Sequence, residues 1–198
     1  QSVEKLAVFQ SFRALDQTDV AVLVIDSPLG IHDQDARLAN MVLEKGKGLL
    51  VLLNKWDLVA GTEQEEELLD QYTRMLRLIP WADRLFTSAV TGKGLGKVFH
   101  QVQRIHARWS SRVQTADLNR FLEDAVNNLQ PPYVGKRPIK FYFVSQPETS
   151  PPLFVVHTNR PGRVATAYKR YLHNRLREAF DFRGSPIKLV FKAAHDPD

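Results

Sequence analysis

Apolar runs alternate with helical stripes through the first half of the chain. Three short apolar runs are typical of buried parallel strands, because both faces of such strands are covered. Between the runs, apolar residues recur at helical spacing, and acidic residues gather at helix starts, where the helix dipole favours them. The pattern predicts helix Val3–Leu15, strand Val20–Ile25, helix Asp33–Glu44, strand Leu49–Leu53, helix Glu63–Ile79, strand Leu85–Thr87 and helix Leu95–Trp109. This order indicates an α/β fold with a parallel sheet.

The second half has a different order of elements. Ser110–Gln114 is the predicted linker, and Thr115 is the predicted N-cap of the helix that follows it. Pro131 and Pro132 end this helix, since neither can continue it. The pattern predicts helix Thr115–Leu129, strand Ile139–Val144, strand Leu153–His157, helix Thr166–Phe180 and strand Ile187–Lys192. The order α-β-β-α-β is typical of a small α+β domain.

A polar tetrapeptide, Asn54-Lys55-Trp56-Asp57, directly follows the second predicted strand. Ligands of open α/β sheets lie beyond the carboxyl ends of the strands. At such a place, the Asp57 carboxylate can accept two hydrogen bonds from a base that offers an N–H and an exocyclic amine side by side. Guanine offers that pair and adenine does not. The Lys55 stem can cover the face of the base, and Asn54 can brace the loop.

A second strand end predicts the same site. Ser88 and Ala89 follow the third predicted strand, and a turn of small residues lets a backbone N–H approach a carbonyl oxygen of the base. The two strand ends together predict a guanine site made of Asn54, Lys55, Asp57, Ser88 and Ala89. The alternative is two ordinary strand-to-helix turns, with Asn54 or Asp57 capping a helix.

Composition narrows the class of protein. The chain has 198 residues, of which 43% are hydrophobic, as is ordinary for a globular protein. It has no cysteine, which excludes disulfides and cysteine metal sites and suits the cytoplasm. No apolar run reaches the roughly eighteen residues of a membrane span, and the first residues show no signal-peptide pattern. The six histidines show no metal-ligand spacing, so we expect no metal site in this chain.

Positive charge is concentrated in the second half. Residues 1–111 carry 13 Lys+Arg against 14 Asp+Glu, whereas residues 112–198 carry 14 against 8. A basic half indicates either a polyanion partner, with nucleic acid first, or a solvated surface. Basic side chains also recur at helical spacing on one face of the last predicted helix, where the same two readings apply. The candidate RNA-binding residues are Arg170, His173 and Arg177 on that face and Lys169 at its margin.

The order and spacing of these motifs resemble the Der (EngA) family, bacterial GTPases with two Era-like G domains in tandem and a C-terminal KH-like domain. The resemblance covers nearly all of the chain. It is carried by Ser2-Val3-Glu4-Lys5, Val24-Ile25-Asp26, Gly30-Ile31, Asp33-Gln34-Asp35, Asn54-Lys55-Trp56-Asp57, Gln130-Pro131-Pro132, Pro151-Pro152, Tyr168-Lys169-Arg170-Tyr171-Leu172 and Gly184-Ser185-Pro186-Ile187. The resemblance implies that residues 1–111 are the C-terminal part of the second G domain, with a partial P-loop GTPase-type sheet. Residues 112–198 would be the KH-like domain.

The resemblance also implies a function. It implies a cytoplasmic GTPase switch that acts in assembly of the large ribosomal subunit, with GTP or GDP as ligand. Ribosomal RNA would be a partner, and the KH-like domain would dock on the G domains. The ligands of Mg²⁺, the phosphate contacts and any catalytic residue are expected outside this chain. The rival hypothesis is an RNA-binding or scaffold module whose G half is degenerate and binds no nucleotide.

Several phosphate-binding patterns are missing. No G-x-x-x-x-G-K-S/T cradle is present, because no Gly-Lys pair is followed by Ser or Thr. Gly92–Gly96 is either an anion-binding turn or a tight connection, and the D-x-x-G match Asp181–Gly184 follows a helix, so we interpret it as a chance match. We therefore expect this segment alone not to hydrolyse GTP. We also expect it to be part of a larger molecule, because the apolar edge of Val20–Ile25 would otherwise face water.

The second half lacks another expected loop. KH domains clamp RNA with a G-x-x-G loop, and no two glycines are three apart in residues 112–198. The resemblance accounts for this absence, since the KH-like domains of the family also lack that loop.

Overall fold

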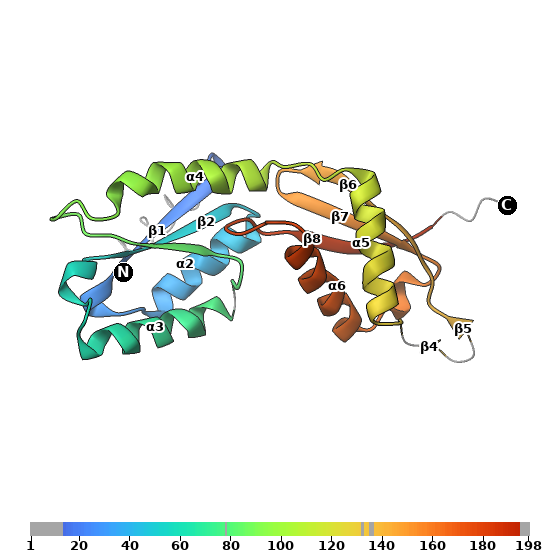
Figure 1. Ribbon diagram of the computed structural model, residues 1–198, viewed down its shortest axis with the longest axis horizontal. Helices are drawn as coiled ribbons and strands as arrows, with labels where there is room; N and C mark the ends of the chain where they lie inside the picture. Colours follow the sequence, from blue (N-terminus) through green and yellow to red (C-terminus); the bar gives the residue numbers. More distant parts are fainter. Residues whose placement is uncertain (1–13, 78, 132, 135–136, 195–198) are drawn as a thin grey trace, which may run out of the picture. The chain divides into compact units, whose positions relative to one another are not determined.

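The computed structural model describes residues 14–77, 79–131, 133–134 and 137–194. The chain divides into two compact units (Figure 1). The first contains the residues up to Trp109 together with Phe182–Pro186, and the second contains Ser110–Asp181 and the residues from Ile187 onward. The predicted helix Val3–Leu15 lies almost wholly outside the described residues.

The first unit is a parallel α/β sandwich, as predicted. Its strands lie in the order β1-β2-β3 and are all parallel, so their carboxyl ends share one edge of the sheet. Helices α2 and α3 cover one face and α4 covers the other (Figure 1). The elements are β1 (Val20–Asp26), η1 (Ser27–Leu29), α2 (Asp33–Glu44), β2 (Gly48–Asn54), η2 (Trp56–Leu58), α3 (Glu63–Leu76), β3 (Asp83–Phe86) and α4 (Leu95–Trp109).

The central strand β2 is buried on both faces. Leu49, Val51 and Leu53 belong to the core under α2 and α3, whereas Leu50 and Leu52 pack with Ile105 of α4 in a separate core. Parallel strands covered by helices on both sides leave no place for polar side chains. This arrangement explains why the apolar run of β2 has no polar position before Asn54.

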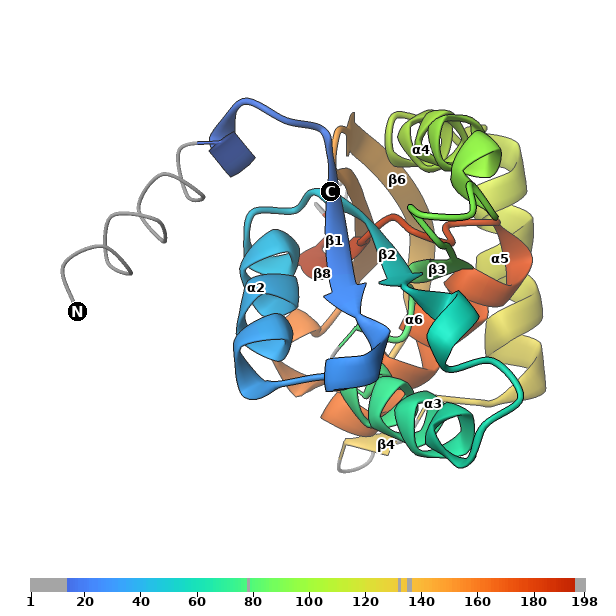
Figure 2. The same cartoon turned by 90° about the vertical axis from the view of Figure 1, so that its left-hand side faces the viewer.

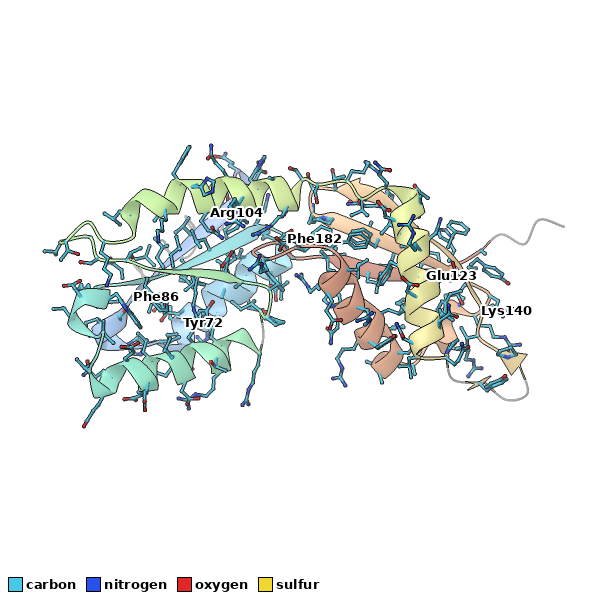
Figure 3. All side chains as sticks on the ribbon, viewed as in Figure 1. Tyr72, Phe86, Arg104, Glu123, Lys140 and Phe182 are labelled. Atoms are coloured by element: carbon cyan, nitrogen blue, oxygen red, sulfur yellow. The ribbon has the colours of Figure 1, made fainter. Side chains whose placement is uncertain are left out.

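Aromatic side chains fill the space between the sheet and α3. Figure 3 labels Tyr72 and Phe86 there, and Tyr72 is 1% exposed. Burial raises the pKa of the Tyr72 hydroxyl to about 12, although the Arg84 guanidinium opposes the shift. That guanidinium lies 4.9 Å from the centre of the Tyr72 ring and 5.5 Å from that of Phe86. The contact with Tyr72 joins β3 to α3, whereas the contact with Phe86 lies within β3.

One loop from beyond α6 also belongs to the first unit. Gly184 donates its backbone N–H to the Trp81 carbonyl at 2.6 Å and accepts from the Leu49 N–H at 2.7 Å. Its φ of +78° lies in the left-handed region that glycine adopts without strain. A Cβ at this position would overlap the side chain of Ile105.

Helix and strand bounds in this unit differ little from those predicted. Helices α2 and α4 have the predicted bounds, and β2 is one residue longer at each end. Helix α3 ends at Leu76 rather than at Ile79. The prediction extended too far because Ile79 is buried and fits the helical stripe. Pro80 disfavours helical geometry at the residue before it, so the chain turns instead.

Strand β1 pairs on one side only within the described residues. Its apolar Val22 and Val24 are 40% and 56% exposed. The expectation that a further strand covers this edge stays a prediction.

The second unit is a small α+β sandwich. Strand β7 lies between β6, to which it is antiparallel, and β8, to which it is parallel. The Tyr168 and Tyr171 hydroxyls of α6 donate to the Leu129 and Ala125 carbonyls at 2.7 and 2.8 Å, which ties α6 to the end of α5. The elements are α5 (Thr115–Asn128), β4 (Tyr133–Val134), β5 (Arg137–Pro138), β6 (Phe141–Thr149), β7 (Pro152–Thr158), η3 (Pro161–Arg163), α6 (Thr166–Ala179) and β8 (Lys188–Ala193).

Three predictions for this unit were wrong in detail. Gln114, not Thr115, is the N-cap of α5, and it makes no side-chain cap hydrogen bond. Strand β6 begins two residues later than predicted and runs on to Thr149, through Pro147. It can include a proline because it is an edge strand whose pairing shifts register between Ser145 and Glu148. The short β4–β5 hairpin was not predicted.

No helix within the described residues combines the length and the apolar character that crossing a bilayer requires.

Candidate functional site

The ends of β2 and β3 are tied together by the Asn54 side chain. Its Oδ1 accepts hydrogen bonds from the Thr87 hydroxyl at 3.3 Å and the Ala89 backbone N–H at 3.2 Å. Backbone bonds of 3.0 Å join Thr87 to the Leu53 carbonyl and to the Trp56 N–H. Figure 2 looks toward this edge of the sheet, where β1 and β2 end side by side. The structure therefore brings together the two predicted halves of the site.

The loop after β2 points alternate side chains inward and outward. Trp56 is buried and its ring lies 4.1 Å from that of Phe86, centre to centre. Lys55 and Asp57, on either side of it, are exposed. Trp56 thus anchors the loop to the core, and this anchor leaves the Asp57 carboxylate facing solvent beside the strand ends.

Lys55 has an unusual backbone conformation. Its φ of 57° and ψ of 32° place it in the left-handed region, where among the described residues every other positive φ belongs to a glycine. Such a conformation costs a residue with a Cβ about 1–2 kcal/mol. Its ammonium lies 2.6 Å from Oδ2 of Asp26, the last residue of β1. Strained residues held by their surroundings occur most often at functional sites.

Ser88 and Ala89 have different environments. Ser88 is fully buried, and its N–H donates to the Lys93 carbonyl at 2.9 Å. Its hydroxyl oxygen accepts from the Thr91 N–H at 3.2 Å, so Ser88 shapes the turn. Ala89 is exposed. Of the two residues, Ala89 is therefore the accessible one, although its backbone N–H already donates to Asn54 Oδ1.

The glycine-rich segment before α4 is a tight connection. Gly92 and Gly94 have φ of +77° and +78°. A Cβ on Gly94 would overlap the carbonyl oxygen of Phe86, so the turn passes directly against the end of β3. This close approach accounts for Gly94, and the left-handed backbone accounts for Gly92, without an anion.

Sequence reasoning did not place Thr87 in the site, and it left Asp26 as either a turn residue or a residue on the nucleotide side. Asp26 pairs with Asn54 across the parallel strands, and Thr87 is the hydroxyl partner of Asn54. A polar residue at the carboxyl end of an apolar strand was the available signal for Asp26. Its contact with Lys55 depends on the register of β1 against β2, which the sequence does not display.

The candidate RNA-binding face of α6 is only partly accessible. Lys169 and Arg170 are exposed, whereas His173 and Arg177 are half-buried. Burial lowers the pKa of His173, and the Arg177 charge lowers it further. Burial also lowers the pKa of Arg177 to about 10. The positive charge that this face offers to solvent therefore comes mainly from Lys169 and Arg170.

The described residues contain no cluster of three His, Cys, Asp or Glu side chains that could hold a metal ion. The D-x-x-G match ends in the loop around Gly184, after α6, rather than beyond a strand of the first unit.

Comparisons with known proteins match both halves of the chain. The model described as "Elongation factor Tu GTP binding domain" matches residues 8–146. The model described as "KH-domain-like of EngA bacterial GTPase enzymes, C-terminal" matches residues 112–192. GTPase Der of Natranaerobius thermophilus is 40% identical over 194 residues, and GTPase Der of Geobacter metallireducens is 39% identical over 193. The chain belongs to the Der (EngA) family of GTPases.

The match to these Der proteins includes 96% and 97% of this chain but only 43% and 44% of theirs. The chain thus spans less than half the length of the curated relatives it matches. Among solved structures, that of Aquifex aeolicus Era bound to GDP and aluminium fluoride has a TM-score of 0.40 and 15% identity. The structural alignment covers 93% of the present chain and 69% of the Era chain.

Proposed function

We propose that this chain recognises guanine in a Der-family GTPase that hydrolyses GTP. The observation that carries the proposal is the Asn54 side chain, which joins the loops after β2 and β3. This link holds the loop that carries the exposed Asp57 carboxylate and the loop that carries the exposed Ala89 on the same edge of the sheet. Residues 1–111 are the C-terminal part of a G domain, and residues 112–198 are the KH-like domain.

Each residue of the site has a distinct role. Asp57 accepts the N–H and the exocyclic amine of guanine, while the Lys55 stem lies along the face of the ring. Asn54 holds the two loops together, and Ser88 shapes the turn that presents Ala89 to the carbonyl oxygen of the base. The contacts to the phosphates and to Mg²⁺ are made by residues outside this chain.

Guanine selectivity tests this proposal. The purified full-length protein is expected to bind a fluorescent GDP analogue, because the carboxylate of Asp57 matches only the guanine edge. Unlabelled GDP and GTP should displace the analogue, and ADP and ATP should not do so at a hundredfold excess. Equilibrium fluorescence titration measures both. Equal competition by adenine nucleotides, or no binding at all, would refute the assignment and favour the RNA-binding scaffold.

We further propose that the KH-like half binds ribosomal RNA in the cytoplasm, during assembly of the large ribosomal subunit, and docks on the G domains. Its excess of positive charge supports a polyanion partner. Lys169 and Arg170 supply the exposed charge on α6. The missing G-x-x-G loop removes the usual clamp for single strands, so contacts to phosphates dominate.

Reversing the charge of that helix face should weaken RNA binding. In the full-length protein, Lys169→Glu with Arg170→Glu is expected to lower the affinity for structured ribosomal RNA. It should also lower the steepness of the salt dependence, because each lost phosphate contact removes about 0.7–0.9 from the slope of log K against log salt. Filter binding across a salt series measures both quantities.

The matched control is Lys188→Glu with Lys192→Glu, which makes the same charge change on two exposed residues of β8. An equal loss in both double variants would mean that RNA responds to net charge alone. No loss in the α6 variant would mean that its face is merely solvated.

A further inference from the structure

We infer that Asp26 is a positioning residue of the guanine site and acts by holding the Lys55 side chain in place. This inference rests on the proposed function and extends it to a residue at the end of a third loop. Asp26 ends β1 and lies next to Asn54 in the parallel pairing of the two strands. Its Oδ2 lies 2.6 Å from the Lys55 ammonium.

The Lys55 side chain needs a partner that fixes its direction before the base binds. The left-handed backbone of Lys55 follows directly after β2, and the Asp26 carboxylate directs its side chain back across the sheet edge toward β1. The Lys55 side chain is 49% exposed, so the loop alone does not restrain it. A long flexible side chain loses rotamer freedom when a ligand orders it, and a carboxylate that orders it beforehand removes part of that loss.

The Asp26 carboxylate in turn depends on Lys55. Its Oδ1 is buried and has no hydrogen-bond partner in the part of the chain that the structure describes. The Lys55 ammonium is the one ion-pair partner of Asp26 within the same described residues. A carboxylate with one buried, unpaired oxygen is costly unless a positive charge compensates it. Removing either partner therefore disturbs the other, which predicts strong coupling between the two positions.

A second ion pair of the first unit lies away from the candidate guanine site. The Lys45 ammonium and the Asp16 carboxylate also approach to 2.6 Å, but they join the residue after α2 to the segment before β1. Both are away from the carboxyl ends of the strands. This pair has the same chemistry and distance as Lys55–Asp26 without access to the base, and it provides a matched control.

A double-mutant cycle in the full-length protein tests the inference. Asp26→Asn is nearly isosteric, and Lys55→Met keeps an apolar stem without the ammonium. Each single variant is expected to raise the Kd of a fluorescent GDP analogue by about 3- to 10-fold, mainly through faster dissociation. The double variant should be no weaker than Lys55→Met alone, because Asp26 acts only through Lys55. Asp26→Glu should restore most of the affinity, and Asp16→Asn should leave it unchanged.

The outcomes of the cycle distinguish the inference from its alternatives. Additive losses in the double variant would show that Asp26 acts independently of Lys55, and parent-like binding by Asp26→Asn would show that it does not act at all. Either result overturns the inference and leaves the proposed function standing. Failure of the parent protein to bind any guanine nucleotide would overturn both. Circular dichroism and the thermal midpoint exclude misfolding. If Asp26→Asn misfolds, Asp26→Ser takes its place in the cycle, and if Lys55→Met misfolds, Lys55→Gln does so.

Discussion

Replacing Asp57 by asparagine in the full-length protein is expected to weaken GDP and GTP binding by roughly thirty-fold to ten-thousand-fold. An amide has one acceptor oxygen and one amino group, so it cannot accept from both the N–H and the exocyclic amine of guanine. The amino group of Asn would instead face the exocyclic amine, and two donors would be left opposed. Each mispaired group costs about 1–3 kcal/mol, and about 1.4 kcal/mol corresponds to a tenfold change in Kd.

The same substitution should create a new preference. Xanthine carries a carbonyl oxygen where guanine has its amine, so an asparagine can donate to that oxygen and accept from the neighbouring N–H. We therefore expect Asp57→Asn to bind xanthosine diphosphate more tightly than GDP, as measured by competition for a fluorescent nucleotide. Asp70→Asn, an exposed carboxylate of α3, is the control and should bind as the parent does. Unchanged GDP affinity in Asp57→Asn would remove Asp57 from the site.

Gly94→Ala is expected to destabilise the first unit by about 2 kcal/mol or more. The left-handed backbone of Gly94 alone costs an alanine about 1–2 kcal/mol. The added methyl group would also overlap the Phe86 carbonyl, which is backbone and moves only with the end of β3. Since Thr87 follows Phe86 and bonds to Asn54, the displacement should also weaken GDP binding.

Gly96→Ala provides a control of opposite sign. Gly96 lies in α4, and no atom lies near the position that its Cβ would occupy. Alanine favours a helix over glycine by about 0.5–1 kcal/mol, so this variant should be slightly more stable. Urea unfolding of the full-length protein measures both, using the transition that added GDP shifts to higher urea. Equal stability of Gly94→Ala and the parent would mean that the turn is looser than the structure describes.

Local pattern was sufficient for most elements of the first unit. The apolar runs of β1 and β2 have no alternation of polar and apolar residues, and such runs are typical of parallel strands covered by helices. The bounds of α2 and α4 followed from stripes that end where a glycine or a change of polarity interrupts them. The end of α3 could not be predicted in this way. Ile79 continues the apolar stripe and is buried, but it lies beyond the end of the helix at Leu76. In that case the proline at position 80 was the better guide.

Part of the candidate site could also be predicted from local pattern. The sequence identifies Asn54, Lys55 and Asp57 as a group, because their chemistry and their position after a strand are local properties. The pairing of Asn54 with Thr87 and Ala89 was expected only in general terms, from the rule that parallel strands end at one edge. The partial burial of His173 and Arg177 was not expected, because helical spacing shows which residues share a face and not what lies against that face.

The sequence by itself thus determined the parallel α/β fold, the α-β-β-α-β order after it, and the residues that could recognise guanine. These properties depend on periodicity and on side-chain chemistry, which are written along the chain. Only the tertiary structure decided that Ser88 shapes the turn while Ala89 faces solvent, and that Asp26 holds Lys55 at 2.6 Å. Such contacts join residues of different strands, and their distances depend on strand register and on backbone conformations that no local pattern specifies.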